Sequence, residues 1–216
     1  MKLSEAVRGV SGTLAADGEF SCIAFATEQE QSQFLTFLEK EKFLPALDNS
    51  KISCVLTTSA LAEKIPPHIK GVFLCDRPKA ALFEIHNRLA RHPDYVGASA
   101  ATVVGEGCSI SPLAAIDCEN VVIGDRVTIE PFVVIKGRVI IGNDVTIRSG
   151  AVIGCKGFSF SKDAQGQNVS VEDTARIIIE DHVEIFEQVA ISTGIFPWEE
   201  TRIGENTKVD AQCHIG

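Results

Sequence analysis

Residues 121–154 read VVIGDRVTIEPFVVIKGRVIIGNDVTIRSGAVIG, and a large aliphatic residue recurs in this stretch at every sixth position. The recurring aliphatics are Ile123, Ile129, Ile135, Ile141, Ile147 and Ile153, and a valine or alanine precedes each of them by two places. A period of six fits neither the helix, with its period of about 3.6, nor the alternation of a single strand. Hexapeptide repeats are the signature of a parallel β-helix, in which three short strands complete a coil of about 18 residues.

The same period extends on both sides of this stretch. Upstream it includes Val104, Ile110 and Ile116, and one extra residue before Asn120 shifts the register by one. Downstream it resumes at Ile179, Ile185, Ile191, Ile203, Val209 and Ile215. We therefore predict about five coils of a left-handed parallel β-helix, with the aliphatics pointing inward and stacking from coil to coil.

Two excursions interrupt the repeat, at residues 155–175 and 194–202. We expect four of their aromatic residues to be exposed: Phe158, Phe160, Phe196 and Trp198. Loops that leave a regular solenoid carry function more often than the coils do. Either these loops pack on neighbouring subunits and coil edges, or they line a ligand cleft. In the second case the candidate substrate-binding residues are Gly157, Phe158, Phe160 and Trp198.

The first hundred residues have a different texture and predict a small α/β domain. Three apolar runs predict short buried strands at residues 34–38, 52–57 and 71–75, and two segments predict helices at residues 40–47 and 79–90. His92-Pro93 ends the second helix. We place the domains at residues 1–97 and 98–216.

Composition excludes several classes of protein. The chain has 216 residues and a net charge of −9, and residues 101–216 carry 9 basic against 17 acidic side chains. No basic patch is present, so we expect no nucleic-acid partner. No apolar run is long enough for a transmembrane helix, and the N-terminus has no secretory signal. The seven cysteines form no Cys-x-x-Cys pair, which favours reduced thiols and a cytoplasmic protein without a metal.

Several motifs along nearly the whole chain carry a family resemblance. They are Phe37-Leu38, Lys42-Phe43-Leu44, DNSKISCVLTT at 48–58, Gly150–Gly154, the GFSF run at 157–160, Arg176–Ile179, Asp181–Ile185, Thr201–Gly204 and Lys208–Asp210. Because these motifs occur together with a small α/β module that precedes the hexapeptide coils, the chain resembles the UDP-3-O-(3-hydroxyacyl)glucosamine N-acyltransferases of lipid A biosynthesis.

The resemblance implies a homotrimer that moves a hydroxyacyl chain to the 2-amino group of a UDP-sugar. The donor would be the phosphopantetheine of acyl carrier protein, or alternatively CoA, with no other cofactor. In that family a Phe, an Asn and a Tyr of the N-terminal module hold the uracil, and Phe37, Lys40 and Phe43 stand in those places. Lys40 has donors but no acceptor, so the choice of nucleotide stays open. Plain core packing is the alternative role for Phe37 and Phe43.

The chemistry needs a proton acceptor, because a sugar amine loses a proton as it attacks a thioester. In the family an Asp begins a run that ends in Ile-x-His, and this His is the proposed base. Asp210 begins the corresponding run here, and the matching base would follow Gly216. We therefore expect a sequence that is incomplete at its C-terminal end. The candidate catalytic residues in hand are His214, which resembles the substrate-binding His of related O-acyltransferases, and Asp210, which could orient a histidine. An exposed histidine and an ordinary turn carboxylate are the alternatives.

Two other functions stay open. A γ-type carbonic anhydrase would need three histidines converging on Zn²⁺, but the coils contain only His182 and His214, at unsuitable spacing. The chain could instead be a paralogue that binds a nucleotide sugar without turning it over.

Overall fold

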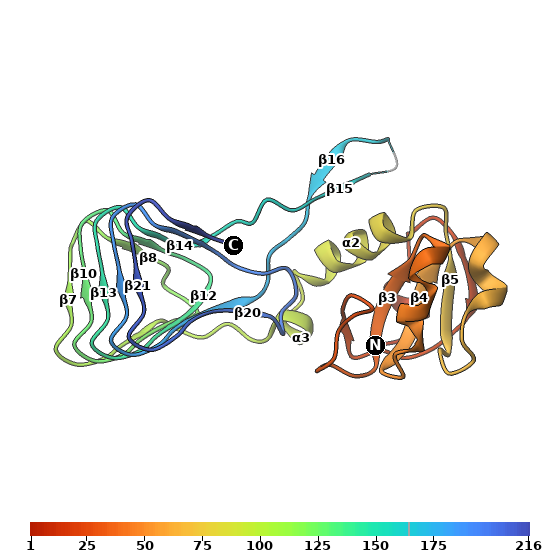
Figure 1. Cartoon of the computed structure of the whole chain (residues 1–216), viewed down its shortest axis with the longest axis horizontal. Helices are drawn as coiled ribbons and strands as arrows, with labels where there is room; N and C mark the ends of the chain where they lie inside the picture. The colour runs from red at the N-terminus through yellow and green to blue at the C-terminus, as the bar shows by residue number, and fades with distance from the viewer. Residues whose placement is uncertain (164) are drawn as a thin grey trace. The chain divides into compact units, whose positions relative to one another are not determined.

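The computed structural model describes residues 1–163 and 165–216, which divide into two compact units (Figure 1). The first unit comprises Met1–Tyr95 and Ser159–Glu172, and the second comprises Val96–Phe158 and Asp173–Gly216. Residues 159–172 thus belong to the first unit. The two consecutive ranges predicted from the sequence, 1–97 and 98–216, place them in the second.

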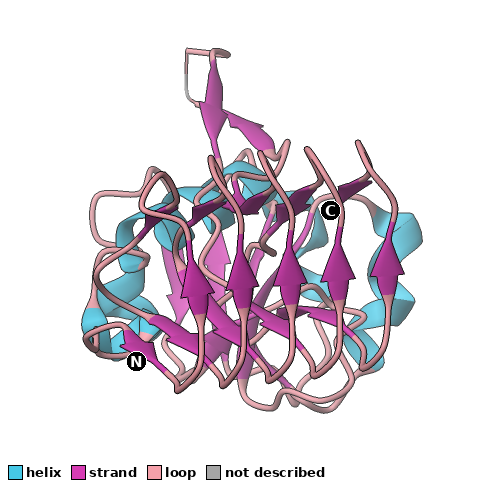
Figure 2. Cartoon of the chain, turned by 90° about the vertical axis from the view of Figure 1, so that its left-hand side faces the viewer, coloured by secondary structure: helices cyan, strands magenta, loops and turns pink. Residues whose placement is uncertain are grey.

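The second unit is a left-handed β-helix whose three walls are parallel sheets of five strands each, as the hexapeptide period predicts (Figure 2). The first wall contains β6 (Val103–Val104), β9 (Val121–Ile123), β12 (Arg138–Ile141), β17 (Arg176–Ile179) and β20 (Glu200–Ile203). The second contains β7 (Ser109–Ile110), β10 (Thr128–Ile129), β13 (Thr146–Ile147), β18 (Glu184–Ile185) and β21 (Lys208–Val209). The third contains β8 (Ala115–Ile116), β11 (Val134–Ile135), β14 (Val152–Cys155), β19 (Ala190–Ser192) and β22 (His214–Ile215).

The repeated aliphatics form the core of the β-helix. Equivalent residues pair in register from coil to coil, as Ile110, Ile129, Ile147 and Ile185 do in the second wall. The aliphatics from Ile123 to Val209, and the valines or alanine two places before most of them, are buried in one cluster. Val104, which the period places inside, is 47% exposed, because β6 pairs with β9 alone and has no strand on its other side in the described ranges.

Polar side chains close one row of turns between the coils. The Asp125 Oδ1 atom accepts the backbone N–H of Glu106 at 2.8 Å, the Asn143 Oδ1 atom accepts that of Asp125 at 2.9 Å, and the Asp181 Oδ1 atom accepts that of Asn143 at 2.7 Å. We call Asp125, Asn143 and Asp181 the turn ladder. Each of its side chains satisfies a backbone donor in the preceding coil, which a turn would otherwise leave without a partner.

The first unit is built on a five-stranded sheet in the order β1-β5-β4-β3-β2, parallel except for β1. Its strands are β1 (Thr13–Ala16), β2 (Cys22–Ile23), β3 (Phe34–Leu38), β4 (Ile52–Thr57) and β5 (Gly71–Leu74), and its helices are α1 (Leu3–Ala6), η1 (Glu41–Asp48), η2 (Ser59–Lys64), α2 (Pro78–Leu89) and α3 (Pro93–Val96). The three predicted strands and the helix predicted at residues 79–90 are confirmed. The helix predicted at residues 40–47 is the 3-10 helix η1, which contains Pro45. None of the helices in the described ranges is long and apolar enough to span a membrane.

A β-hairpin also belongs to the first unit. It consists of the antiparallel strands β15 (Phe160–Lys162) and β16 (Asn168–Ser170). The Asn87 side chain of α2 donates to the Ser170 carbonyl at 2.9 Å and accepts the Glu172 N–H at 2.8 Å. The Arg77 guanidinium donates to the Lys162 carbonyl at 2.8 Å. These bonds fasten the strands of the hairpin to α2 and to Arg77, which directly precedes it.

His86 of α2 makes this attachment sensitive to pH. Its side chain is buried, with Nδ1 3.0 Å from the Tyr95 hydroxyl and Nε2 2.8 Å from the Glu172 carbonyl. Burial lowers the pKa of His86 below its ordinary value. The unfolded chain therefore binds this proton more readily, and the free energy of unfolding should fall as the pH drops through about 6.5.

We expect the loss to approach about 1.4 kcal/mol per pH unit between the unfolded-state and folded-state pKa values of this group. Urea unfolding of the wild type and His86→Gln between about pH 5 and about pH 7.5 measures the loss. Equal slopes of stability against pH in the two proteins would contradict the assignment to His86.

Candidate functional site

One outward row of the third wall contains His214. The row consists of Ala115, Val134, Val152, Ala190 and His214, each in register with the next. The neighbours of the imidazole along this row are small and apolar, and His214 itself is exposed. His214 is thus the polar member of an otherwise apolar row.

The His214 ring also contacts a polar pair in the preceding coils. Its Nε2 atom lies 3.0 Å from the Ser192 Oγ atom, which lies 3.3 Å from the Cys155 Sγ atom. We call these three residues the His214 cluster. Sequence reasoning missed the other two members. The repeat could have drawn attention to Ser192. A glycine follows the inward aliphatics Ile123, Ile141 and Ile153, whereas a serine follows Ile191.

Asp210 lies in the turn before β22. Its exposed carboxylate accepts the backbone N–H of Ala211 at 2.9 Å. Within residues 1–163 and 165–216, no hydrogen bond or ion pair joins Asp210 to His214. An orienting role for this carboxylate stays a prediction.

The first excursion begins with a backbone contact at Gly157. The Gly157 N–H donates to the Asp173 carboxylate at 2.7 Å, and this bond ties the start of the excursion to its end. Phe158 is 93% exposed, and Phe160, the first residue of β15, is also exposed. Both rings are accessible to a ligand, and their role in substrate binding stays a prediction.

The second excursion corrects one expectation. Phe196, predicted to be exposed, is fully buried. A tight turn folds it inward, because the Phe196 N–H donates to the Glu199 carboxylate and the Glu199 N–H donates to the Phe196 carbonyl, each at 3.0 Å. The Trp198 ring stacks on Phe196 at 5.9 Å between ring centroids, with 13° between their planes, and is half-buried. Trp198 is thus the part of this loop that retains accessible aromatic surface.

In the first unit, Phe37 takes part in aromatic packing. Its ring is half-buried and meets the Phe25 ring edge-on at 6.4 Å, and Phe25 meets Phe83 at the same distance and angle. This arrangement favours the packing role for Phe37.

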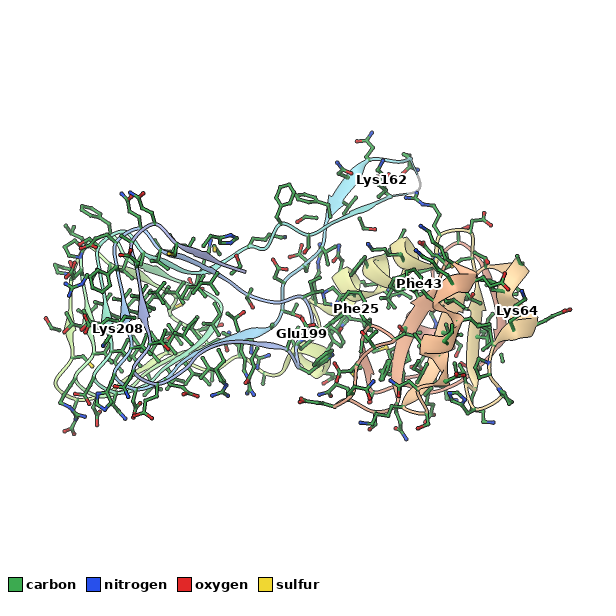
Figure 3. The ribbon with its side chains drawn as sticks, viewed as in Figure 1. Phe25, Phe43, Lys64, Lys162, Glu199 and Lys208 are labelled. Atoms are coloured by element: carbon green, nitrogen blue, oxygen red, sulfur yellow. The ribbon has the colours of Figure 1, made fainter. Side chains whose placement is uncertain are left out.

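Phe43 is differently placed, on the exposed surface of η1 (Figure 3). Its ring is 56% exposed, and the Lys42 ammonium lies 4.8 Å from the ring centroid. Lys40 is exposed, and its carbonyl accepts the Phe43 N–H at 3.0 Å. The segment therefore holds an open aromatic ring with two ammonium groups close by in the chain, which suits a base attached to phosphates.

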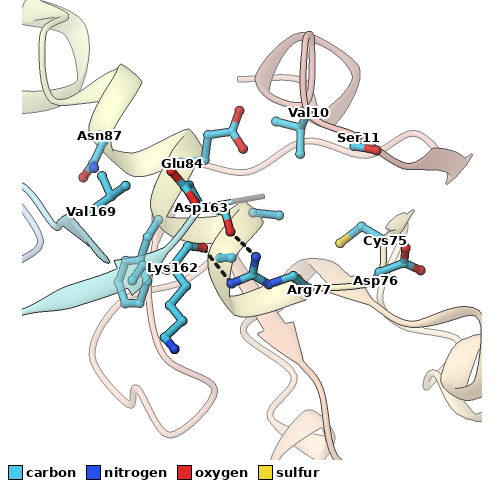
Figure 4. Close-up of a pocket in the computed structure, with 14 residues that line it drawn as sticks. Val10, Ser11, Cys75, Asp76, Arg77, Glu84, Asn87, Lys162, Asp163 and Val169 are labelled. Atoms are coloured by element: carbon cyan, nitrogen blue, oxygen red, sulfur yellow. Dashed lines mark hydrogen bonds between the residues drawn. The ribbon is translucent and has the colours of Figure 1, made fainter. Parts of the chain in front are cut away.

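A separate cavity of about 400 Å³ lies between α2 and the hairpin, with residues such as Glu84, Lys162 and Val169 on its walls (Figure 4). Burial raises the pKa of the Cys75 thiol, which also lines it, to about 11. Of the described residues that line this cavity, none is a candidate site residue from the sequence. Among the residues that the structure describes, no three His, Cys, Asp or Glu side chains form a group that could hold a metal ion.

Residues 120–155 match the model of the bacterial transferase hexapeptide family, described as six repeats. Among solved structures, a point mutant of perosamine N-acetyltransferase from Caulobacter crescentus, in complex with CoA and GDP-perosamine, is 12% identical with a TM-score of 0.25. That similarity covers 81% of this chain and 69% of the other.

Curated relatives match along almost the whole chain. The UDP-3-O-acylglucosamine N-acyltransferase of Coxiella burnetii (strain Dugway 5J108-111) is 28% identical over 96% of this chain and 67% of its own length. The protein of the same name from Helicobacter pylori is 26% identical over 100% of this chain and 69% of its own. That from Helicobacter hepaticus is 31% identical over 96% of this chain and 67% of its own. The chain therefore belongs to the UDP-3-O-acylglucosamine N-acyltransferase family.

Proposed function

We propose that this chain moves an acyl group from a thioester to the amino group of a UDP-linked amino sugar, as in lipid A biosynthesis. The observation that carries the proposal is the similarity over 96% of the chain to a relative named for N-acylation of UDP-3-O-acylglucosamine. The donor is acyl carrier protein or CoA, and the protein acts in the cytoplasm.

In the proposed reaction the sugar amine attacks the thioester carbonyl carbon. A C–N bond forms, the C–S bond breaks, the thiol leaves with one proton, and the amine loses one proton to a general base. In this proposal His214 contacts the substrate. Charge develops on the carbonyl oxygen in the transition state, so a fixed N–H donor near that oxygen accelerates the step.

We propose that Phe43 and its two neighbouring lysines bind the nucleotide. A uracil ring can stack on the exposed face of Phe43, and the Lys40 and Lys42 ammonium groups can attract the diphosphate. Neither lysine can accept a hydrogen bond from uracil, so this site should depend on stacking and charge more than on base pairing.

Replacing Phe43 with alanine should weaken UDP binding by about 5- to 150-fold, because base–aromatic stacking contributes about 1–3 kcal/mol. Isothermal titration with UDP measures this change. Phe132→Ala is the matched control, since Phe132 is also an exposed phenylalanine but belongs to the β-helix. UDP affinity that is the same in all three proteins would remove Phe43 from the site.

We propose that the chain acts as a homotrimer. The first wall presents an outward row of Val103, Val122, Ile140 and Ile178 in register, and the first three are exposed. A contiguous apolar row of this kind is typical of an association surface. Sedimentation of the native protein at the mass of one chain would contradict the trimer.

The transferase proposal is tested with the protein as its gene encodes it. UDP-3-O-acylglucosamine is incubated with either an acyl carrier protein thioester or an acyl-CoA, and the product is detected by mass spectrometry. A mass increase equal to the added acyl group supports the proposal. Binding of the UDP-sugar without a product from either donor would instead support the paralogue that binds and does not turn over.

A further inference from the structure

The His214 cluster spans three successive coils of the third wall. We propose that Ser192 is a positioning residue that fixes neutral His214 in the tautomer with its proton on Nδ1, and that Cys155 supports Ser192 in doing so. The members come from β14, β19 and β22, and the strand register places Cys155 directly opposite Ser192.

The direction of the hydrogen bonds follows from what each group can donate. Ser192 has one hydroxyl proton and two neighbours, the His214 Nε2 atom at 3.0 Å and the Cys155 Sγ atom at 3.3 Å. An unprotonated imidazole nitrogen is a good acceptor, whereas a thiol sulfur is a weak one. The best arrangement therefore has the Cys155 thiol donating to Ser192 and the Ser192 hydroxyl donating to Nε2 of His214.

Burial makes this arrangement hard to replace with water. Ser192 is only 2% exposed, so a hydroxyl that lost its partner would stay unsatisfied. The residue is also held through its backbone, because the Thr201 hydroxyl donates to the Ser192 carbonyl at 2.9 Å. The serine is fixed, and the exposed imidazole of His214 adjusts to it.

The tautomer decides what the exposed side of His214 can do. A neutral imidazole carries one proton, so an Nε2 atom that accepts from Ser192 leaves the proton on Nδ1. The structure gives Nδ1 no hydrogen-bond partner in the described ranges. This nitrogen would therefore donate to an oxygen, such as the carbonyl of the acyl group, and would not remove a proton. That use of the donor rests on the proposed function, whereas the tautomer itself does not.

The test is ¹⁵N NMR of the histidine-labelled native protein at about pH 8.5, where imidazoles are neutral. The wild type should show a protonated Nδ1 and an unprotonated Nε2 at His214. In Ser192→Ala the ratio of the Nδ1–H to the Nε2–H form should fall by about three- to tenfold, as expected for losing one ordinary hydrogen bond. Cys155→Ser, which keeps a donor, should retain the wild-type ratio.

Ser109→Ala is the matched control, because Ser109 is an exposed residue of β7, away from the third wall. Unchanged His182 signals check that each variant is folded. A wild-type His214 that carries its proton on Nε2, or an equal ratio in Ser192→Ala, would overturn the inference. A wild type with the expected tautomer that nevertheless acylates no amino sugar would overturn the proposed function and leave the inference supported.

Discussion

Substituting alanine for Gly154 should cost about 3 kcal/mol or more of stability, which is a large fraction of the free energy of unfolding of an ordinary domain. Gly154 has φ +85°, which side chains rarely adopt, and a Cβ built there would lie 1.9 Å from the Lys136 carbonyl oxygen. That oxygen belongs to the backbone of the neighbouring coil, so it can move only if the strand pairing moves with it. Urea unfolding followed by circular dichroism measures the change.

Gly137→Ala separates the two causes. Gly137 has nearly the same φ, +80°, but nothing lies within 4 Å of its ideal Cβ position. Gly137→Ala should lose only about 1–2 kcal/mol of stability, the cost of placing a residue with a side chain at a positive φ. Equal destabilisation of the two variants would show that the contact with Lys136 contributes nothing.

Removing the His214 imidazole should lower kcat/KM for acyl transfer by about 10²- to 10³-fold, the usual effect of losing one fixed donor to a developing oxyanion. The decrease should appear in kcat more than in KM, because such a donor acts most strongly in the transition state. Initial rates of His214→Ala with a saturating acyl donor measure it.

His182→Ala provides the control for this variant. His182 is also an exposed histidine of the β-helix, but it lies in a turn, where its Nδ1 atom is 3.9 Å from the Asp144 carboxylate. Its removal should leave the rate within about twofold of the wild type. If His214→Ala also keeps the wild-type rate, His214 does not touch the reacting atoms.

The β-helix could be predicted from the sequence because its core depends on a strictly local pattern. Within an uninterrupted run such as Ile123 to Ile153, each inward aliphatic is separated from the next by one short strand and one turn, so its position in the chain determines its position in the core. The α/β strands were also visible, since runs such as Phe34–Leu38 and Ile52–Thr57 are apolar along most of their length.

The remaining features depend on partners that are distant in sequence or on turns that leave no pattern. Phe196 is buried by a turn closed through Glu199, and an aromatic residue in a loop gives no sign of such a turn. The hairpin joins the first unit through Asn87, which is 83 positions from its acceptor at Ser170. Ser192 was missed because its significance comes from two residues that contact its hydroxyl from the coils before and after, Cys155 and His214.

The turn ladder has a consequence for synthesis on the ribosome. The side chains that close the turns at Glu106, Asp125 and Asn143 come from residues 18 to 38 positions later in the chain. A newly made coil thus has a turn N–H group without its side-chain acceptor until the following coil has emerged from the exit tunnel. We expect the nascent chain to fold one coil behind its synthesis, with the newest coil always the least protected from proteases and from pairing with other chains.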